Sequence, residues 1–464
     1  AVRNCHLIKG PQNFIDCVNT DGGIIEGNVI EGGITSYSAS TDTAYQGIRI
    51  GGCTNVSVLN NRVIRDASNG YCAEGIYTGA VGSQCSGLVI KGNRVEDAWD
   101  HAIYMNNGTG HVVSDNILRS DSPPLVVAGG DMSTTTKQGH TVTGNVVELS
   151  SSTPDDGKSG IYLRDINQTV CSGNVIKGCS RGIYVGAVTY SSTSHAMSDN
   201  VISNNTILDW TDQGILFGKA GQTLGDISNN IITGNVLVCD TANVENDGVG
   251  ISMVIGQESA ANIAFDNSIT NNQINGSGDA GISVQYHTRL KIVGNSIVNP
   301  AEATTPTTFT GIWIQDSVNL DVSQNTIVDT NGSPTMKSGI DGDNSTTGSS
   351  FHNNTVLNAE TSGTPPIRKT QQASSGNSHR GNRTGDDPLT GTLTLANAST
   401  TTVTNDNWNY NLGYTSRVLL MPLDTAGAAL NVWLDTASGT AGTSFVLDHS
   451  AAAGTEEFFY EIVQ

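Results

Sequence analysis

Residues 88–95 read Leu88-Val-Ile-Lys-Gly-Asn-Arg-Val95, a short alternation of apolar and polar residues that ends on Asn-x-Val. Alternation with a period of two predicts a strand, and the β-branched apolar residues favour the same structure. The pattern returns almost unchanged in Val56-Ser-Val-Leu-Asn-Asn-Arg-Val63, Leu290-Lys-Ile-Val-Gly-Asn-Ser-Ile297 and Leu320-Asp-Val-Ser-Gln-Asn-Thr-Ile327. Its asparagine recurs, in most steps after about thirty residues, as Asn28, Asn61, Asn93, Asn116, Asn145, Asn174, Asn205, Asn235, Asn272, Asn295, Asn325 and Asn354.

A second short strand, usually beginning Gly-Ile, lies between most of these asparagines. Its first residues are Gly47, Gly75, Ala102, Gly160, Gly182, Gly214, Gly250, Gly281, Gly311 and Gly339. Such short strands cannot bury a face alone, but strands from successive repeats can stack on one another. Leucine-rich repeats would need helical segments, and no amphipathic helix pattern is visible. The sequence therefore predicts a parallel β-helix of about twelve rungs, roughly 55 Å long at ~4.8 Å per rung.

The repeat also predicts the domain organisation. It fills residues 1–358 and fails in residues 359–388, which we interpret as an irregular connector. Short strands return in residues 389–464 with another rhythm, which predicts a small antiparallel β domain. These strands are expected at 393–395, 400–403, 417–421, 430–434, 444–447 and 457–463.

Charge narrows the range of partners. The chain has 43 Asp and Glu against 22 Lys and Arg, a formal charge of -21. Nucleic acid and anionic membrane surfaces need a basic face, so neither is expected as a partner. No apolar run approaches the roughly 18 residues of a membrane-spanning helix. Neutral or weakly charged polymers remain compatible with this composition.

Metal and cofactor signals are weak. The eight cysteines are scattered without Cys-x-x-Cys spacing, so zinc is not expected. They are predicted to be small buried apolar residues or, for at least one pair, a disulfide. Asp341-Gly-Asp-Asn344 resembles an oxygen-rich cation loop but lacks the remaining spacing of a calcium-binding loop. We predict no metal and no cofactor.

Aromatic residues gather at one position of the second strand. The Ile points inward, so the next residue points outward. That outward column contains Tyr77, Tyr104, Tyr162 and Tyr184. Flat aromatic faces with a hydroxyl group suit sugar rings, which predicts a carbohydrate-binding platform. A stabilising aromatic ladder, or a surface covered by another subunit, is the alternative.

Acidic residues lie beside this column. Glu74 precedes Gly75, and Asp97, Asp100 and His101 precede Ala102. Asp209 and Asp212 repeat the spacing of the two aspartates, and Asp readily forms turns of this kind. The earlier unit differs from the later one because it also contains His101 and Tyr104, and because Glu74 and Tyr77 are expected one rung before it. We therefore predict Glu74, Asp97, Asp100 and His101 as catalytic residues.

Two chemistries suit such a group. Glycoside hydrolysis needs one carboxylic acid and a second carboxylate, and carboxylates on adjacent rungs can supply both. A lyase instead needs a cation to neutralise a uronate and a Tyr, His or Lys base. His101, Tyr104, Lys158, Tyr162 and Arg164 are candidates for those roles. The residues leave both chemistries open, with Tyr77, Tyr104, Tyr162, Arg164 and Tyr184 expected to bind substrate.

Two sets of motifs resemble a known family. Asp100-His-Ala-Ile-Tyr104 is similar to the Asp-His-Gly-Ile-Tyr rungs of the pectate-lyase-like superfamily of right-handed parallel β-helices. Gly391-Thr-Leu-Thr-Leu395, Ala441-Gly-Thr-Ser-Phe445 and Glu456-Glu-Phe-Phe-Tyr-Glu-Ile-Val463 are similar to C-terminal modules of phage tail proteins. Over nearly its whole length the chain resembles the bacteriophage tailspike polysaccharide depolymerases. The family places its acids differently in each member, so the motifs support the fold more than the catalytic residues.

The resemblance implies a function. It implies a homotrimer in the virion tail that binds and cleaves capsular polysaccharide or O-antigen on a bacterial host, with 389–464 serving trimerisation or carbohydrate binding. An endo-glycosidase is favoured over a polysaccharide lyase. The alternatives are a non-catalytic carbohydrate-binding tail fibre or adhesin, and a uronate lyase or epimerase on the same fold. The chain begins at Ala1 within a repeat, which would fit a missing particle-binding domain.

Overall fold

The structure is a computed structural model. It describes residues 1–8, 13–32, 45–65, 72–79, 84–106, 108–120, 122–128, 139–149, 158–186, 197–218, 227–239, 244, 248–254, 264–300, 310–330, 336, 338–343, 345–357, 367–368, 378–380, 382–384, 390–394, 400–404, 417–422, 432–435, 444–449 and 457–463.

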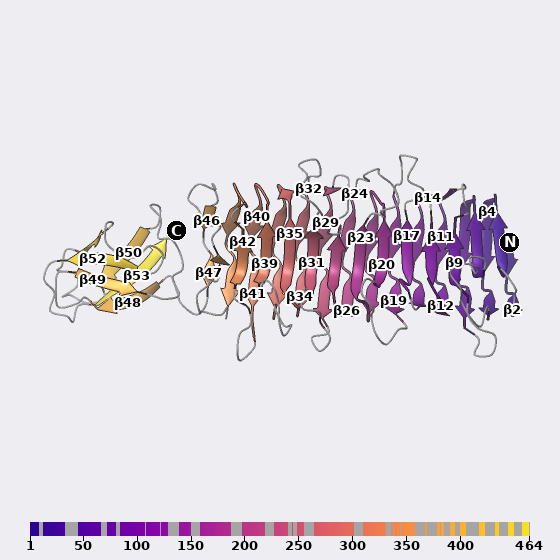
Figure 1. The fold of residues 1–464 in the computed structure, drawn as a ribbon, viewed down its shortest axis with the longest axis horizontal. Helices are drawn as coiled ribbons and strands as arrows, with labels where there is room; N and C mark the ends of the chain where they lie inside the picture. The colour runs from indigo at the N-terminus through magenta and orange to yellow at the C-terminus, as the bar shows by residue number, and fades with distance from the viewer. Residues whose placement is uncertain are drawn as a thin grey trace.

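Three long parallel sheets form most of the molecule, and each turn of the chain adds one strand to each sheet (Figure 1). Sheet A contains β1 (Val2–Arg3), β4 (Asp21–Glu26), β7 (Thr54–Leu59), β11 (Val89–Lys91), β15 (Val112–Ser114), β18 (Thr141–Thr143), β21 (Val170–Ser172), β25 (Val201–Ser203), β29 (Ile231–Thr233), β33 (Ser268–Thr270), β37 (Lys291–Val293), β40 (Asp321–Ser323), β43 (Ser350–His352) and β46 (Ser378–Arg380), with β10 (Cys85–Ser86) and β14 (Gly108–Thr109) beside them. Sheet B contains β2 (His6–Ile8), β5 (Val29–Glu31), β8 (Arg62–Ile64), β12 (Arg94–Ala98), β16 (Ile117–Ser120), β19 (Val146–Leu149), β22 (Val175–Lys177), β26 (Thr206–Trp210), β30 (Val236–Cys239), β34 (Gln273–Asn275), β38 (Ser296–Val298), β41 (Thr326–Val328), β44 (Thr355–Leu357) and β47 (Arg383–Thr384). Sheet C contains β3 (Ile15–Val18), β6 (Gln46–Gly51), β9 (Glu74–Thr78), β13 (Ile103–Met105), β17 (Leu125–Ala128), β20 (Ser159–Arg164), β23 (Arg181–Gly186), β27 (Gln213–Phe217), β31 (Val249–Val254), β35 (Ala280–Gln285), β39 (Thr310–Gln315), β42 (Ser338–Gly342) and β45 (Ile367–Arg368).

A smaller parallel sheet extends one edge of the stack. Its strands are β24 (Met197–Ser198), β28 (Ile227–Ser228), β32 (Ala264–Phe265) and β36 (His287–Thr288). The described parts of the chain contain strands and no helix, so the predicted all-β class and stacked parallel architecture are confirmed.

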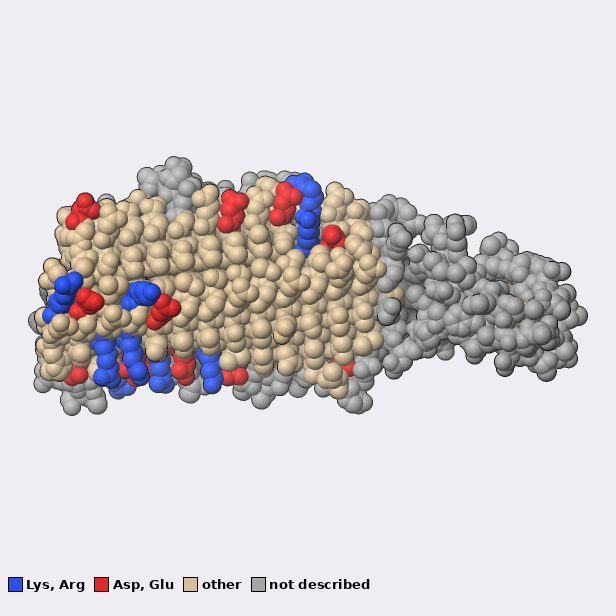
Figure 2. All heavy atoms as spheres, turned by 180° about the vertical axis from the view of Figure 1, so that it is seen from behind, with Lys and Arg blue, Asp and Glu red and all other residues tan. Residues whose placement is uncertain are grey.

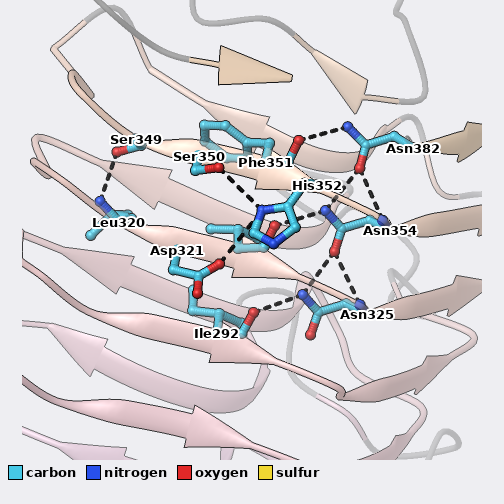
Figure 3. Close-up of polar contacts among 11 residues, drawn as sticks. Ile292, Leu320, Asp321, Asn325, Ser349, Ser350, Phe351, His352, Asn354 and Asn382 are labelled. Atoms are coloured by element: carbon cyan, nitrogen blue, oxygen red, sulfur yellow. Dashed lines mark hydrogen bonds and ion pairs between the residues drawn. The ribbon is translucent and has the colours of Figure 1, made fainter. Parts of the chain in front are cut away.

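The marker asparagines form a continuous hydrogen-bonded ladder at the corner between sheets A and B. In each step, the backbone N–H and the Nδ2–H of one asparagine donate to Oδ1 of the next, as Asn116 does to Asn145 at 3.1 and 2.9 Å. Figure 3 shows the last steps, from Asn325 through Asn354 to Asn382. These side chains are buried, so the ladder satisfies polar groups that would otherwise be costly to place in the core.

Glycine at the start of the sheet C strands has a packing reason. A Cβ on Gly182 would lie 2.4 Å from Cγ2 of Ile207 and 2.5 Å from the carbonyl oxygen of Gly214. The chain passes too close to sheet B and to the next rung for a larger residue. The following isoleucines, such as Ile183 and Ile215, fill the interior and are fully buried.

The stack includes strands that the repeat pattern did not predict. Strand β17 carries Leu125 inward in place of the usual Gly-Ile pair, and it pairs with β13 and β20. Strands β45, β46 and β47 extend the stack into residues 359–388, where the sequence predicted a connector. Asn382 continues the ladder there, but Arg383 and Thr384 follow it instead of the usual apolar residue.

Residues beyond 388 form two small antiparallel sheets of three strands. One has the order β48 (Thr390–Thr394), β53 (Glu457–Val463), β50 (Arg417–Pro422), and the other β49 (Thr400–Thr404), β52 (Ser444–His449), β51 (Val432–Asp435). All six predicted strands occur close to their expected positions, because each is a short run with apolar residues that lies between clusters of turn residues.

Candidate active site on sheet C

Glu74 is the first residue of β9 on sheet C. Its register neighbour Gln46 donates an Nε2–H hydrogen bond to Oε2 of Glu74 at 3.0 Å. Burial, and then the negative charge of Asp100 on the next rung, raise the pKa of the Glu74 carboxyl from 4.5 to about 7. A carboxyl group that is half protonated near neutral pH can donate a proton as a general acid.

Asp100 and His101 lie one rung beyond Glu74, at the turn into β13. Nδ1 of His101 lies 2.9 Å from the carbonyl oxygen of Pro123, so Nδ1 carries the hydrogen and donates it. Nε2 then keeps its lone pair and lies 3.5 Å from Oδ1 of Asp100. Burial lowers the pKa of His101 more than the charge of Asp100 and the Pro123 carbonyl raise it. His101 is therefore a neutral imidazole with an unprotonated nitrogen beside the two acids.

The rings of Tyr77 and Tyr104 continue this group along the outer face of sheet C. Their centroids are 5.7 Å apart with an interplanar angle of 17°, and the His101 ring stacks on Tyr104 at 4.9 Å. Nη1–H of Arg164 donates to the Tyr104 hydroxyl oxygen at 3.2 Å. Burial raises the pKa of Tyr104, so its phenol stays protonated. Both tyrosines keep part of their surface exposed, which suits them to contact a ligand.

Tyr162 and Tyr184 form a separate stacked pair, with centroids 4.7 Å apart. Val126 on β17 interrupts the outward column between Tyr104 and Tyr162 and is itself buried. The Tyr184 ring lies over Gly186, where a Cβ would come within 2.4 Å of the ring. Tyr184 is only 7% exposed, so it offers little surface to a sugar. The continuous platform suggested by the sequence is thus two tyrosine pairs, of which Tyr77 and Tyr104 adjoin the acids.

A later unit of the chain shares this frame but carries other charges. In this later unit, Asp212 and Gln213 occupy the positions of Asp100 and His101. One rung before them, Arg181 occupies the position of Glu74. Nε of Arg181 lies 2.8 Å from Oδ2 of Asp212 and donates to the side chain of Gln213 at 2.8 Å. The later unit therefore holds an ion pair where the earlier unit holds two carboxylates. Burial is the main cause of the raised pKa of Glu74, and the negative charge of Asp100 adds to it.

Asp97 makes its contact on a different surface. It adopts a left-handed backbone conformation, with φ of 54°, and its carboxylate lies 3.5 Å from Nε of Arg119 on sheet B. Asp209 repeats both features, with φ of 53° and Nζ of Lys177 at 3.7 Å. Asp tolerates left-handed angles at tight turns, which accounts for the pair. The structure groups Glu74, Asp100 and His101, whereas Asp97 lies at a bulge within β12 on sheet B.

Comparison with known proteins defines the fold. A family model described as "Right handed beta helix region" matches residues 75–258. The solved structure of the tailspike protein of E. coli bacteriophage HK620 in complex with a pentasaccharide aligns with a TM-score of 0.51 and 14% identity, covering 96% of this chain and 87% of that one. The chain is a right-handed parallel β-helix.

Two further comparisons complete this picture of the β-helix. A single-substitution variant of the HK620 tailspike, also in complex with pentasaccharide, aligns with the same TM-score of 0.51 and 14% identity, over 96% of this chain and 87% of that one. No match is found among the curated protein sequences.

Two site residues escaped the sequence reasoning. Gln46 directly precedes Gly47, as Glu74 directly precedes Gly75 in the next unit. Aligning the two units would therefore have indicated that the Gln46 and Glu74 side chains are neighbours. Arg181 occupies the same position in the later unit, and only the fold shows that it pairs with Asp212. Two further acidic residues shortly before Gly160, Asp155 and Asp156, lie outside the described residues.

A second polar group lies on sheet A of the β-helix. Nδ1 of His352 lies 3.1 Å from Oγ of Ser350 and 3.7 Å from Oδ1 of Asp321 (Figure 3). Both neighbours meet the same ring nitrogen, whereas a serine relay needs them on opposite nitrogens. This group therefore does not have the geometry of a nucleophilic triad.

Asp343, in the stretch that resembles an oxygen-rich cation loop, has a structural role. The Asp343 carboxylate accepts hydrogen bonds from the Asp316 and Ser345 backbone N–H groups and from the Thr346 hydroxyl, which close the turn. In the described part of the chain, no group of three or more His, Cys, Asp or Glu is placed to hold a metal ion. The eight cysteines are free thiols, mostly buried. Within the described ranges, no helix is long and apolar enough to span a membrane.

Proposed function

We propose that the chain is a bacteriophage tailspike that binds and cleaves a bacterial surface polysaccharide, capsule or O-antigen, as an endo-glycoside hydrolase. The observation that carries this proposal is the pairing of Glu74, whose pKa is raised to about 7, with Asp100 on the next rung. Two carboxyl groups in different protonation states are what glycosidic cleavage requires. The fold that it shares with a tailspike solved with a bound pentasaccharide supports the same assignment.

In the proposed reaction, protonated Glu74 gives its proton to the glycosidic oxygen as the bond to the sugar breaks. The Asp100 carboxylate faces the developing positive charge on the sugar and either activates water or attacks directly. Water supplies the hydroxyl group of the new reducing end, and its remaining proton restores the acid. Nε2 of His101, which is unprotonated, accepts a hydrogen bond from the substrate or from the attacking water.

Substrate would bind along the outer face of sheet C. Tyr77 and Tyr104 give a partly exposed aromatic surface next to the acids, and Arg164 anchors the Tyr104 hydroxyl. Tyr162 and Tyr184 lie farther along the same face and would mainly support it. The protein would act as a homotrimer in the virion tail, without a cofactor.

The test is polysaccharide cleavage by wild type and two variants. We expect wild type to lower polymer size, and Glu74→Gln and Asp100→Asn each to lose about 10²–10⁴-fold in rate, the usual contribution of an acid or base. Asp209→Asn is the control, because this aspartate repeats Asp97, lies away from the site and is partnered with Lys177. Full activity in both variants would show that the site is elsewhere, while the fold would stand.

A lyase is the second candidate, and one observation favours it. The unprotonated Nε2 of His101 can abstract a proton, and Arg164, 3.2 Å from the Tyr104 hydroxyl, can approach a uronate carboxylate. Elimination leaves an unsaturated sugar that absorbs near 235 nm, whereas hydrolysis does not. Rising absorbance during cleavage would assign the lyase. An unchanged polymer that still binds the protein would assign a carbohydrate-binding tail fibre instead.

A further inference from the structure

One face of the β-helix carries no charge over a long stretch beyond Asp115, which lies between Ser114 and Ile117 on its first rung and pairs with Lys91. It comprises the two outward columns of sheet A and the first outward column of sheet B, from Val112, Ser114 and Ile117 on one rung to Ser268, Thr270 and Gln273 on another. Between these limits every outward residue of the three columns is Val, Ile, Ser, Thr or Gln. We call this surface the uncharged face. Figure 2 shows it in tan, with charged side chains confined to its margins.

The uncharged face exposes β-branched side chains to an unusual degree. Ile117, Val146 and Val175 are register neighbours on sheet B and are 47%, 45% and 39% exposed. Val170 and Ile231 on sheet A are 38% and 40% exposed. They account for five of the eight large hydrophobic residues that are exposed in the described part of the chain. Exposed apolar residues gathered on one surface indicate an interaction site.

Charge identifies the partner. Two copies of a chain with a net charge of -21 repel each other over most of their surface. The uncharged face is where that repulsion is least, and its apolar centre gains from burial. Beside it, Arg119, Glu148 and Lys177 form an exposed column of alternating sign. An apolar centre beside a polar rim of mixed charge is the anatomy of a protein–protein interface.

The size of the surface also fits a protein partner. The strands from β15 to β33 span roughly 29 Å at ~4.8 Å each, and the columns with their rim are roughly 26 Å wide. The product, about 750 Å², is close to the ~800 Å² that each partner contributes to a stable interface. The surface carries no aromatic residue of the kind that would stack on sugar rings.

We propose that the uncharged face is where this chain packs against another copy of itself. The inference rests on the proposed self-association and not on the proposed catalysis. The candidate active site lies on sheet C, a different sheet, so packing of copies through sheets A and B would leave it open.

The experiment measures molar mass by light scattering and sedimentation on the full chain, of 48.4 kDa. We expect wild type to sediment as a multiple of that mass and Val146→Lys to dissociate, with a dissociation constant raised at least about 30-fold, as for a central interface residue. Val175→Glu should act in the same way, because it lies on the next rung. Thr326→Lys is the matched control, since it occupies the same column of sheet B beyond the uncharged face.

The outcomes separate the two proposals. Wild type that stays at 48.4 kDa at every concentration overturns self-association and leaves catalysis untouched. Wild type that associates while Val146→Lys and Val175→Glu associate equally well places the contact on another surface and overturns this assignment. Dissociation of both variants, with Thr326→Lys unchanged and circular dichroism spectra preserved in all, supports it.

Discussion

Replacing Glu74 with glutamine should stabilise the protein above about pH 4.5, and most at neutral and alkaline pH. Folding buries the Glu74 carboxyl beside Asp100, which raises its pKa from 4.5 to about 7. A raised pKa in an acid means that the folded state favours the protonated form. Ionisation therefore costs stability progressively as the pH rises from 4.5 to 7, and the full cost persists above pH 7.

The magnitude follows from the shift. A change of about 2.5 pKa units corresponds to about 3 kcal/mol at ~1.4 kcal/mol per unit. Glutamine cannot ionise, yet its side-chain oxygen can still accept the hydrogen bond from Gln46. Glu74→Gln should therefore match wild type near pH 4.5 and exceed its unfolding free energy by up to about 3 kcal/mol at pH 8. A stabilising substitution that abolishes activity is expected for a residue kept for function.

The assay is urea unfolding followed by circular dichroism, for wild type and Glu74→Gln, at several values between pH 4.5 and 8.5. Glu148→Gln on β19 serves as the control, because that side chain is exposed on sheet B. The control should show no comparable pH-dependent gain. A difference between wild type and Glu74→Gln that stays constant over the range would mean that Glu74 titrates normally, and the reasoning for a general acid would fail.

Three other predictions concern the scaffold. Asn145→Ala should lower the unfolding free energy by about 2–6 kcal/mol in urea unfolding, because it leaves the Asn116 N–H without its acceptor inside the core and removes the Nδ2–H bond to the Val113 carbonyl. Burial lowers the pKa of His140 and of His287 to about 4. The unfolding free energy should therefore fall as the pH drops from about 6.5 to 4, by about 3 kcal/mol for each histidine. Thermal unfolding at each pH checks this, and an unchanged melting temperature would contradict it. Arg181→Gln should cost about 3–5 kcal/mol, because it leaves the buried Asp212 carboxylate without its cation, and the loss should shrink if Asp212→Asn is added.

The sequence by itself determined the solenoid. Three local features recur: alternating β-branched residues, an asparagine at a turn and a Gly-Ile pair. Each indicates short strands, and such strands can bury their apolar side chains only by stacking on those of the next repeat. The same logic missed the sheet C strand of Leu125 and the rung ending at Thr384, because there the local markers change while the backbone continues the stack. Neighbouring rungs impose their register on such segments, which no local pattern reports.

The tertiary structure decided which of the predicted site residues share an environment. Glu74 and Asp100 are 26 positions apart, and only stacking places their charges close enough to raise the Glu74 pKa. Asp97 is three residues from Asp100, yet its left-handed turn directs the carboxylate to Arg119 on another sheet. Proximity in a β-helix depends on the rung and on the direction of each side chain, and both are set by the stacked backbone rather than by sequence distance.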